Sequence, residues 1–131
     1  MPLRPSFLTQ ILMLGLAGAG AATLALRPVS IVDGDSVHLA GLGLARLEGV
    51  DTPELDGACA EEVSLARQAA RRLGELLREG PVVVVWDRGR REKYGRPLVR
   101  IEAAGRDVAL TLIAEGLGRP YDGGERPDWC G

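Results

Sequence analysis

Two aspartates flank a glycine in the first third of the sequence, at a spacing suited to chemistry. Asp33 and Asp35 stand on either side of Gly34, and an Asp-Gly pair between apolar runs is a strong signal for a hairpin turn. We expect this turn to place both carboxylates on the same side of the backbone. A plain hairpin turn is the alternative interpretation. An EF-hand loop is excluded because its required glycine and distal glutamate are missing.

A second acidic motif follows further along the chain. Pro53 has no N–H for a sheet ladder, so a strand must end here, and Thr52 before it is restricted to extended geometry. Asp35, Asp51 and the backbone carbonyl of Thr52 would offer three oxygen ligands to a hard cation such as Ca2+, leaving other positions for water and a substrate phosphate. Glu54 adds a further carboxylate. A solvated turn around the proline is the alternative.

Arg46 and Arg96 are candidates for binding a phosphate group. The planar guanidinium group matches two phosphate oxygens at once, and Gly95 permits a turn that directs the side chain after it. The alternative role for each arginine is a solvated surface charge. Tyr94 and Tyr121 could stack on nucleic-acid bases, whereas a partly buried core position is the commoner role of a tyrosine.

The elements that must position these residues can be predicted from hydrophobic periodicity and from turn residues. Apolar and alternating runs predict strands, and apolar residues at helical spacing predict two helices. The predicted order is strands over 24–32, 36–40 and 44–50, a helix over 61–79, strands over 81–87 and 98–102, a helix over 108–115, and an irregular tail over 117–131. Five short antiparallel strands with a helix between the third and fourth predict an α+β fold, a five-stranded Greek-key barrel of the OB type.

Composition limits the class of protein. A chain of 131 residues, 46% hydrophobic and 26% charged, is one globular domain and not a disordered chain. With aromatic residues at 4%, the core must be aliphatic. The net charge of −2 excludes a strongly basic nucleic-acid clamp. Two cysteines and one histidine are too few for a zinc site within one chain.

The N-terminal segment, residues 1–22, differs from the rest. It carries Arg4 as its single charge, then an apolar stretch and small residues around Ala21, which is typical of a signal peptide. A membrane anchor is the main alternative, and a buried helix is a third. Either of the first two would place the domain over 23–131 outside the cytoplasm, in the periplasm, secreted or anchored to the membrane.

If the domain is exported, its two cysteines, Cys59 and Cys130, are expected to be oxidised. An even number of cysteines in a small exported domain favours a disulfide. Such a bridge would tie the C-terminal tail to the start of the long helix. The alternative is a pair of buried free thiols.

The motifs occur together in an order that resembles the staphylococcal nuclease (thermonuclease) family. The resemblance covers residues 23–121, and the ending Trp129-Cys130 resembles that of short exported members. The matching blocks are Val32-Asp33-Gly34-Asp35-Ser36, Arg46, Val50-Asp51-Thr52-Pro53-Glu54 and Lys93-Tyr94-Gly95-Arg96.

The resemblance implies a Ca2+-dependent endonuclease that hydrolyses DNA and RNA to 3′-phosphate and 5′-hydroxyl ends. It implies that Asp35, Asp51 and Thr52 hold the metal, that Arg46, Glu54 and Arg96 are catalytic, and that Asp33, Lys93, Tyr94 and Tyr121 line the metal or substrate site. This chain departs from the family in its short segment after Glu54 and in its acidic composition. Both departures count against tight binding of long nucleic acids.

Two other function classes stand beside the nuclease. OB folds often bind oligonucleotides without cutting them, so a non-catalytic oligonucleotide-binding module is the main alternative. A calcium-binding structural protein of the cell envelope is the second. For a nuclease, single-stranded or frayed substrates are expected, because a shallow OB face stacks exposed bases. A monomer is the default for a domain of this size.

Overall fold

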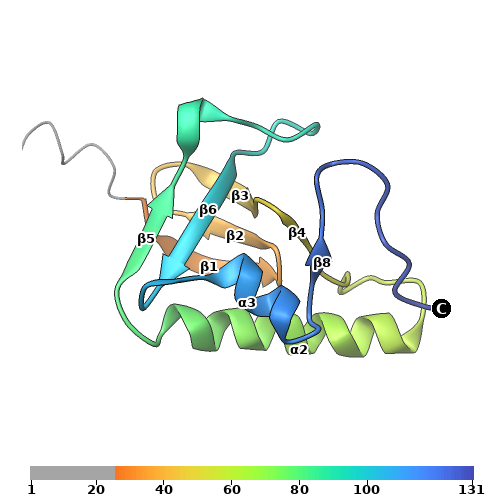
Figure 1. Cartoon of the computed structure of the whole chain (residues 1–131). Coiled ribbons are helices and arrows are strands. Elements are labelled where there is room, and N and C mark those ends of the chain that lie inside the picture. Colours follow the sequence, from red (N-terminus) through yellow and green to blue (C-terminus); the bar gives the residue numbers. More distant parts are fainter. Residues whose placement is uncertain (1–25) are drawn as a thin grey trace, which may run out of the picture.

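The computed structural model describes residues 26–131 (Figure 1). The predicted signal peptide or anchor over 1–22 lies outside the described residues. Within 26–131, no helix is both long enough and apolar enough to cross a membrane.

Over residues 26–131 the chain forms one curled sheet, a small second sheet and two α-helices (Figure 1). The elements are β1 (Pro28–Asp33), β2 (Ser36–Leu39), β3 (Gly43–Leu47), β4 (Val50–Asp51), α2 (Ala60–Leu77), β5 (Val82–Val85), the 3-10 turn η2 (Asp87–Gly89), β6 (Leu98–Ala103), β7 (Arg106–Asp107), α3 (Val108–Ala114) and β8 (Arg119–Pro120). The strand order of the main sheet is β1-β2-β3-β6-β5, with β7 beside β6. The predicted α+β class with two helices is confirmed.

One feature of the prediction is wrong: the strands are not all antiparallel. β3 and β6 pair in parallel, with Arg46 opposite Leu98 and Leu47 opposite Val99. A parallel pair needs a long crossover connection, and the segment between these strands contains the whole of α2 and β5. Apolar alternation places a residue on a face of the sheet but does not encode the direction of its neighbour.

The predicted third strand is divided in two, and the tail is less irregular than predicted. Gly49 has a φ of +86°, a backbone conformation that glycine adopts without strain, and the turn there separates β3 from β4. β4 then pairs with β8 from the tail, with Asp51 opposite Arg119. A two-residue strand that contains Pro120 has too little pattern for detection in the sequence.

The core is aliphatic, as predicted. Residues from the sheet and both helices are almost completely buried together: Val37, Leu39, Ala45, Leu47, Val50, Leu73, Leu76, Val84, Val99, Ile101, Ala103, Val108, Ala109 and Leu112. The helix α2 lies along the sheet in Figure 1 and begins beside the C-terminal end of the chain. Its capping residue is Cys59, whose sulfur accepts a hydrogen bond from the Glu62 N–H at 3.4 Å.

Candidate active site

The turn between β1 and β2 presents Asp33 and Asp35 to the segment after β4. The Asp35 N–H donates to the Asp33 carboxylate at 3.2 Å, which closes the turn. A Cβ on Gly34 would lie 2.7 Å from the Ala69 Cβ and 2.9 Å from side-chain atoms of Thr52. Glycine is therefore required here because α2 and residue 52 approach the turn so closely.

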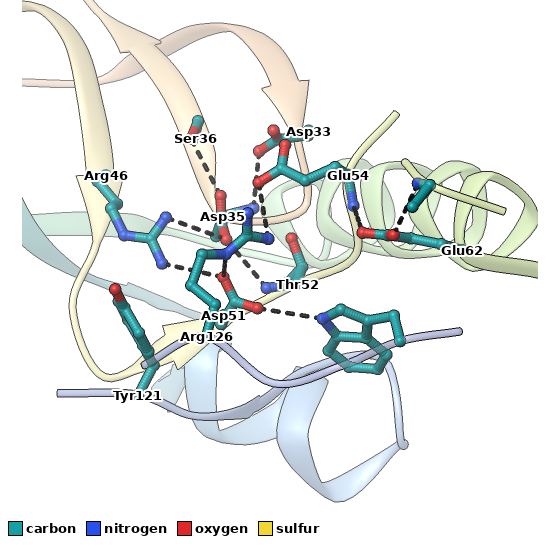
Figure 2. A network of polar contacts seen from close by, with 12 residues as sticks. Asp33, Asp35, Ser36, Arg46, Asp51, Thr52, Glu54, Glu62, Tyr121 and Arg126 are labelled. Atoms are coloured by element: carbon teal, nitrogen blue, oxygen red, sulfur yellow. Dashed lines mark hydrogen bonds and ion pairs between the residues drawn. The ribbon is translucent and has the colours of Figure 1, made fainter. Parts of the chain in front are cut away.

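Asp35 links three parts of the fold through its buried carboxylate (Figure 2). It accepts hydrogen bonds from the Ser36 hydroxyl at 3.0 Å and from the Thr52 N–H at 2.9 Å. The Arg46 guanidinium lies 3.2 Å from the same carboxylate. A buried carboxylate without such partners would be strongly destabilising, so these contacts make its position possible.

Asp51 is completely buried and is surrounded by donors. Its Oδ1 lies 3.4 Å from Arg46 Nη2 and accepts from Arg126 Nε at 3.0 Å. Its Oδ2 accepts from the Trp129 indole N–H at 3.1 Å. Two of these three partners come from the C-terminal tail, which folds back across the site (Figures 1 and 2).

Glu54 stands at the edge of this group, in contact with solvent. Its carboxylate forms an ion pair with Arg126 Nη2 at 2.9 Å. Its backbone N–H donates to Glu62 Oε2 at 3.0 Å, and the Ala58 N–H donates to Glu62 Oε1 at 3.1 Å. Glu62, in the first turn of α2, thereby fixes the short loop that carries Glu54.

Burial, and after it neighbouring negative charge, raises the pKa of two of these carboxyl groups. Burial, then the charge of Asp35, raises the pKa of Asp33 to about 7. Burial also raises the pKa of Glu54; the Arg126 charge opposes this, and the charges of Asp35 and Asp51 add to it. Both carboxyl groups are therefore protonated more readily than an ordinary aspartate or glutamate.

The two predicted arginines approach the cluster from different segments. Arg46, on β3, is buried and lies over the Tyr121 ring, 5.0 Å from its centroid. Arg96 precedes β6, forms an ion pair with Glu92 at 3.3 Å and lies 3.5 Å from the Ser36 hydroxyl. The parallel pairing of β3 with β6 is what brings the two guanidinium groups to the same end of the sheet.

A cleft of about 610 Å³ opens beside the cluster. Six basic residues line it: Arg46, Arg90, Arg91, Lys93, Arg96 and Arg126. Glu54, Tyr94 and Tyr121 line it as well. Lys93 and Tyr94 are exposed at its rim, with the Lys93 ammonium over the Tyr94 ring. The residues predicted to be catalytic, to hold the metal or to bind substrate therefore lie in the cleft or in the carboxylate cluster behind it.

A family model described as "Staphylococcal nuclease homologue" matches residues 45–127, more than half of the chain. The chain belongs to this family. It is also similar to two curated proteins of Bacillus subtilis (strain 168), "SPbeta prophage-derived endonuclease YokF" and "Endonuclease YncB". Each is 35% identical over 92 residues, which cover 67% of this chain but 31% of YokF and 44% of YncB. The chain thus spans less than half the length of these relatives.

Two residues of the first acidic motif precede the range matched by the staphylococcal nuclease homologue model. Asp33 and Asp35 lie before residue 45, yet the structure places them against Thr52 and Arg46 from the matched range. The site is therefore assembled from the start of the described domain as well as from its matched part.

Sequence reasoning about this staphylococcal nuclease homologue missed Arg126, Trp129 and Glu62. Arg126 and Trp129 lie in a tail with no periodic pattern, so nothing local indicated where their side chains point. One signal was present: the disulfide between Cys59 and Cys130, which the structure contains as predicted, with 5.9 Å between the Cα atoms. This bridge predicts that the tail ends beside the start of α2, but it does not specify contacts with Asp51.

The donor set of the site fits a hard divalent cation. Asp35 and Asp51 provide carboxylate oxygens next to the backbone of Thr52. Asp33, whose pKa is raised by burial and then by the charge of Asp35, lies beside them. Oxygen ligands of this kind suit Ca2+. Within residues 26–131, one group of three potential metal-ligating side chains has its ligand atoms within 4.8 Å of one another. These residues are Cys59, Glu62 and Cys130. The two sulfurs are joined in the disulfide, so this group is not a metal site.

Proposed function

We propose that this chain is a Ca2+-dependent endonuclease that hydrolyses the phosphodiester bonds of DNA and RNA, leaving 3′-phosphate and 5′-hydroxyl ends. The observation that carries the proposal is the arrangement of Arg46, Arg96 and Glu54 around one cleft, directly in front of the Asp35–Asp51 cluster. Two relatives with the word endonuclease in their names support it.

The two guanidinium groups bind and neutralise the phosphate. A phosphodiester is an anion and repels nucleophiles, so positive donors placed around it lower the barrier to attack. Arg46 is held rigidly by Asp35, Asp51 and the Tyr121 ring, and Arg96 is held by Glu92. Preorganised donors of this kind cost little reorganisation when charge develops in the transition state.

Glu54 orients the attacking water and accepts its proton. Its pKa is raised by burial and by neighbouring carboxylates, which makes it a better base near neutral pH than an ordinary glutamate. The water oxygen forms a bond to phosphorus and the bond from phosphorus to the 5′ oxygen breaks. That oxygen takes a proton from solvent water and leaves as a hydroxyl, and Glu54 later returns its proton to solvent. Asp35, Asp51 and the Thr52 carbonyl would hold the Ca2+, which supplies positive charge to the phosphate oxygens when bound.

Lys93, Tyr94 and Tyr121 contact the substrate along the cleft. Tyr94 is 75% exposed and free to stack on a base, which favours single-stranded or frayed DNA and RNA. We further propose that residues 1–22 are a signal peptide or membrane anchor, that the domain over 23–131 acts outside the cytoplasm, and that it is a monomer. The disulfide supports export, because such bonds persist in oxidising compartments.

The test is cleavage of a labelled single-stranded DNA and of an RNA by the full-length chain, with Ca2+ and with a chelator. The variant Glu54→Gln keeps the shape of the side chain but removes the base. We expect it to reduce the cleavage rate roughly 10²–10⁴-fold. The control variant is Glu48→Gln, because Glu48 lines the same cleft but pairs with Arg90, away from the cluster.

Ca2+-dependent cleavage to 3′-phosphate ends that is lost in Glu54→Gln and kept in Glu48→Gln supports the proposal. A folded protein that binds the strand without cutting it would favour the alternative, a non-catalytic oligonucleotide-binding module. Cleavage that continues undiminished in the chelator would contradict the role of Ca2+.

A further inference from the structure

The C-terminal tail places a third guanidinium group on the carboxylates of the site. Arg126 Nε lies 3.0 Å from Asp51 Oδ1, and its Nη2 lies 2.9 Å from Glu54 Oε1. One side chain thus bridges the carboxylate assigned to the metal and the one assigned to the water (Figure 2). No motif in the sequence assigns a role to this residue.

Contacts of the residues on either side of Arg126 anchor the tail beside the site. The Trp129 indole donates to Asp51 Oδ2 at 3.1 Å and is stacked under the Arg119 guanidinium, 4.1 Å from the ring centroid. Arg119 Nη1 also donates to the Asp128 carbonyl at 2.8 Å. The disulfide of Cys130 then fixes the end of the tail to the start of α2. Arg126 therefore belongs to a segment anchored beside the site.

Each oxygen of Asp51 already has a partner. Arg46 and Arg126 contact Oδ1, and Trp129 donates to Oδ2. Each carboxylate oxygen can accept two partners. A cation that binds Oδ1 must therefore displace Arg46 or Arg126, whereas Oδ2 keeps one position beside the Trp129 indole. The Arg46 side chain is 9% exposed and Trp129 is 8% exposed, whereas the Arg126 side chain is 43% exposed. Arg126 is the partner that can return to water at least cost, because exposed ion pairs contribute little net free energy.

We propose that Arg126 is a positioning residue that competes with the divalent cation for Asp51 while holding Glu54 in place. The proposal rests on the proposed function, which assigns Asp51 to the metal. It predicts that Arg126 weakens cation binding and that the two positive charges exchange at this carboxylate. Cation affinity is thereby set by a residue of the tail, outside the acidic motifs themselves.

The test is calorimetric titration of the full-length chain with CaCl2, without nucleic acid, so that the readout is binding and not turnover. Arg126→Gln removes the competing charge, and we expect the dissociation constant for Ca2+ to fall roughly three- to thirty-fold, the range for losing a partly exposed ion-pair network. Arg126→Lys keeps the charge but not the planar fork, and should give an intermediate value.

The matched control is Arg90→Gln, which removes the same charge from the same cleft at a residue paired with Glu48. Its dissociation constant should stay within about twofold of the wild type, since it does not touch the cluster. Circular dichroism of each variant would check that the fold is kept. We expect it to be kept in the Arg126 variants because the Arg126 side chain is substantially exposed.

The outcomes separate the two proposals. Tighter binding in Arg126→Gln but not in Arg90→Gln supports the competition. Equal affinities in the wild type and Arg126→Gln, or an equal gain in Arg90→Gln, would overturn it and leave the nuclease assignment intact. No binding of Ca2+ by any variant would overturn both the metal assignment and the competition.

Discussion

Two buried hydroxyl groups lie beside Asp35, and they differ in hydrogen bonding. The Ser36 hydroxyl donates to the Asp35 carboxylate at 3.0 Å and lies 3.5 Å from the Arg96 guanidinium. The Thr52 hydroxyl is buried and has no hydrogen-bond partner within residues 26–131. Since a buried polar group without a partner keeps its full desolvation cost, these two hydroxyls should affect the free energy of unfolding in opposite directions.

We expect Thr52→Val to stabilise the protein and Ser36→Ala to destabilise it. Valine has nearly the shape of threonine without the unpaired oxygen, so the free energy of unfolding should rise by about 1 kcal/mol. Loss of the Ser36 hydroxyl leaves a buried carboxylate with one donor fewer and should cost about 1–3 kcal/mol. Thermal unfolding by circular dichroism measures both, because about 1 kcal/mol shifts the Tm of a domain this size by roughly 4–8 °C. A lower Tm in Thr52→Val would show that its hydroxyl has a partner after all.

At the residue scale, the parts of the site that could be predicted are those set by short motifs. The Asp33-Gly34-Asp35 turn and the proline after Thr52 restrict the backbone locally, so the positions of these side chains follow from a few residues. Arg126 and Trp129 could not be placed in this way. Their contacts with Asp51 span more than 70 residues of sequence, and the tail has no periodicity that would orient them.

At the scale of elements, the tail and the start of α2 form one unit. The disulfide joins Cys59, the capping residue of α2, to Cys130, across 71 residues. Within the same tail, β8 pairs with β4, and the buried Trp129 donates a hydrogen bond to Asp51. The bridge therefore stabilises both the helix start and the tail that carries Arg126.

Reduction of the disulfide should lower the stability of the domain substantially. In the chain-entropy model, a bridge closing a loop of this length contributes roughly 4 kcal/mol. We expect a reductant such as TCEP to lower the Tm by more than about 10 °C. The double variant Cys59→Ser, Cys130→Ser should have the low Tm with or without reductant. An unchanged Tm in the reduced wild type would mean that the paired strands and Trp129 hold the tail by themselves.

The positions of most strands could be predicted from the sequence, but the relative direction of paired strands could not. Apolar runs located most of the strands, and helical spacing located α2 within a few residues. The parallel pairing of β3 with β6 depends on how the chain crosses over through α2, and strand patterns do not record a crossover. That pairing brings Arg46 and Arg96 to the same end of the sheet. The sequence therefore predicts a phosphate-binding role for both residues but not the strand pairing that places them together.

At the scale of the whole molecule, charge is distributed unevenly. The chain has a net charge of −2, yet six basic residues line the cleft. Several of them are already paired, as Arg90 is with Glu48 and Arg96 with Glu92. Under the proposed function, the attraction for nucleic acid would come from the cleft, and the rest of the surface would contribute little to holding a long strand.

This confinement predicts a shallow dependence of binding on salt. Each phosphate neutralised on a single strand contributes about −0.7 to the slope of log K against log salt, so six cleft charges limit the slope to about −4. Fluorescence anisotropy of a labelled DNA strand with Glu54→Gln in Ca2+ would measure it without cleavage. Lys93→Gln should reduce the slope by about 0.7, whereas Arg71→Gln, on the exposed surface of α2 outside the cleft, should leave it unchanged. A slope much steeper than −4, or one reduced by Arg71→Gln, would show that the strand is held by surface beyond the cleft, and the acidic composition would then not limit binding.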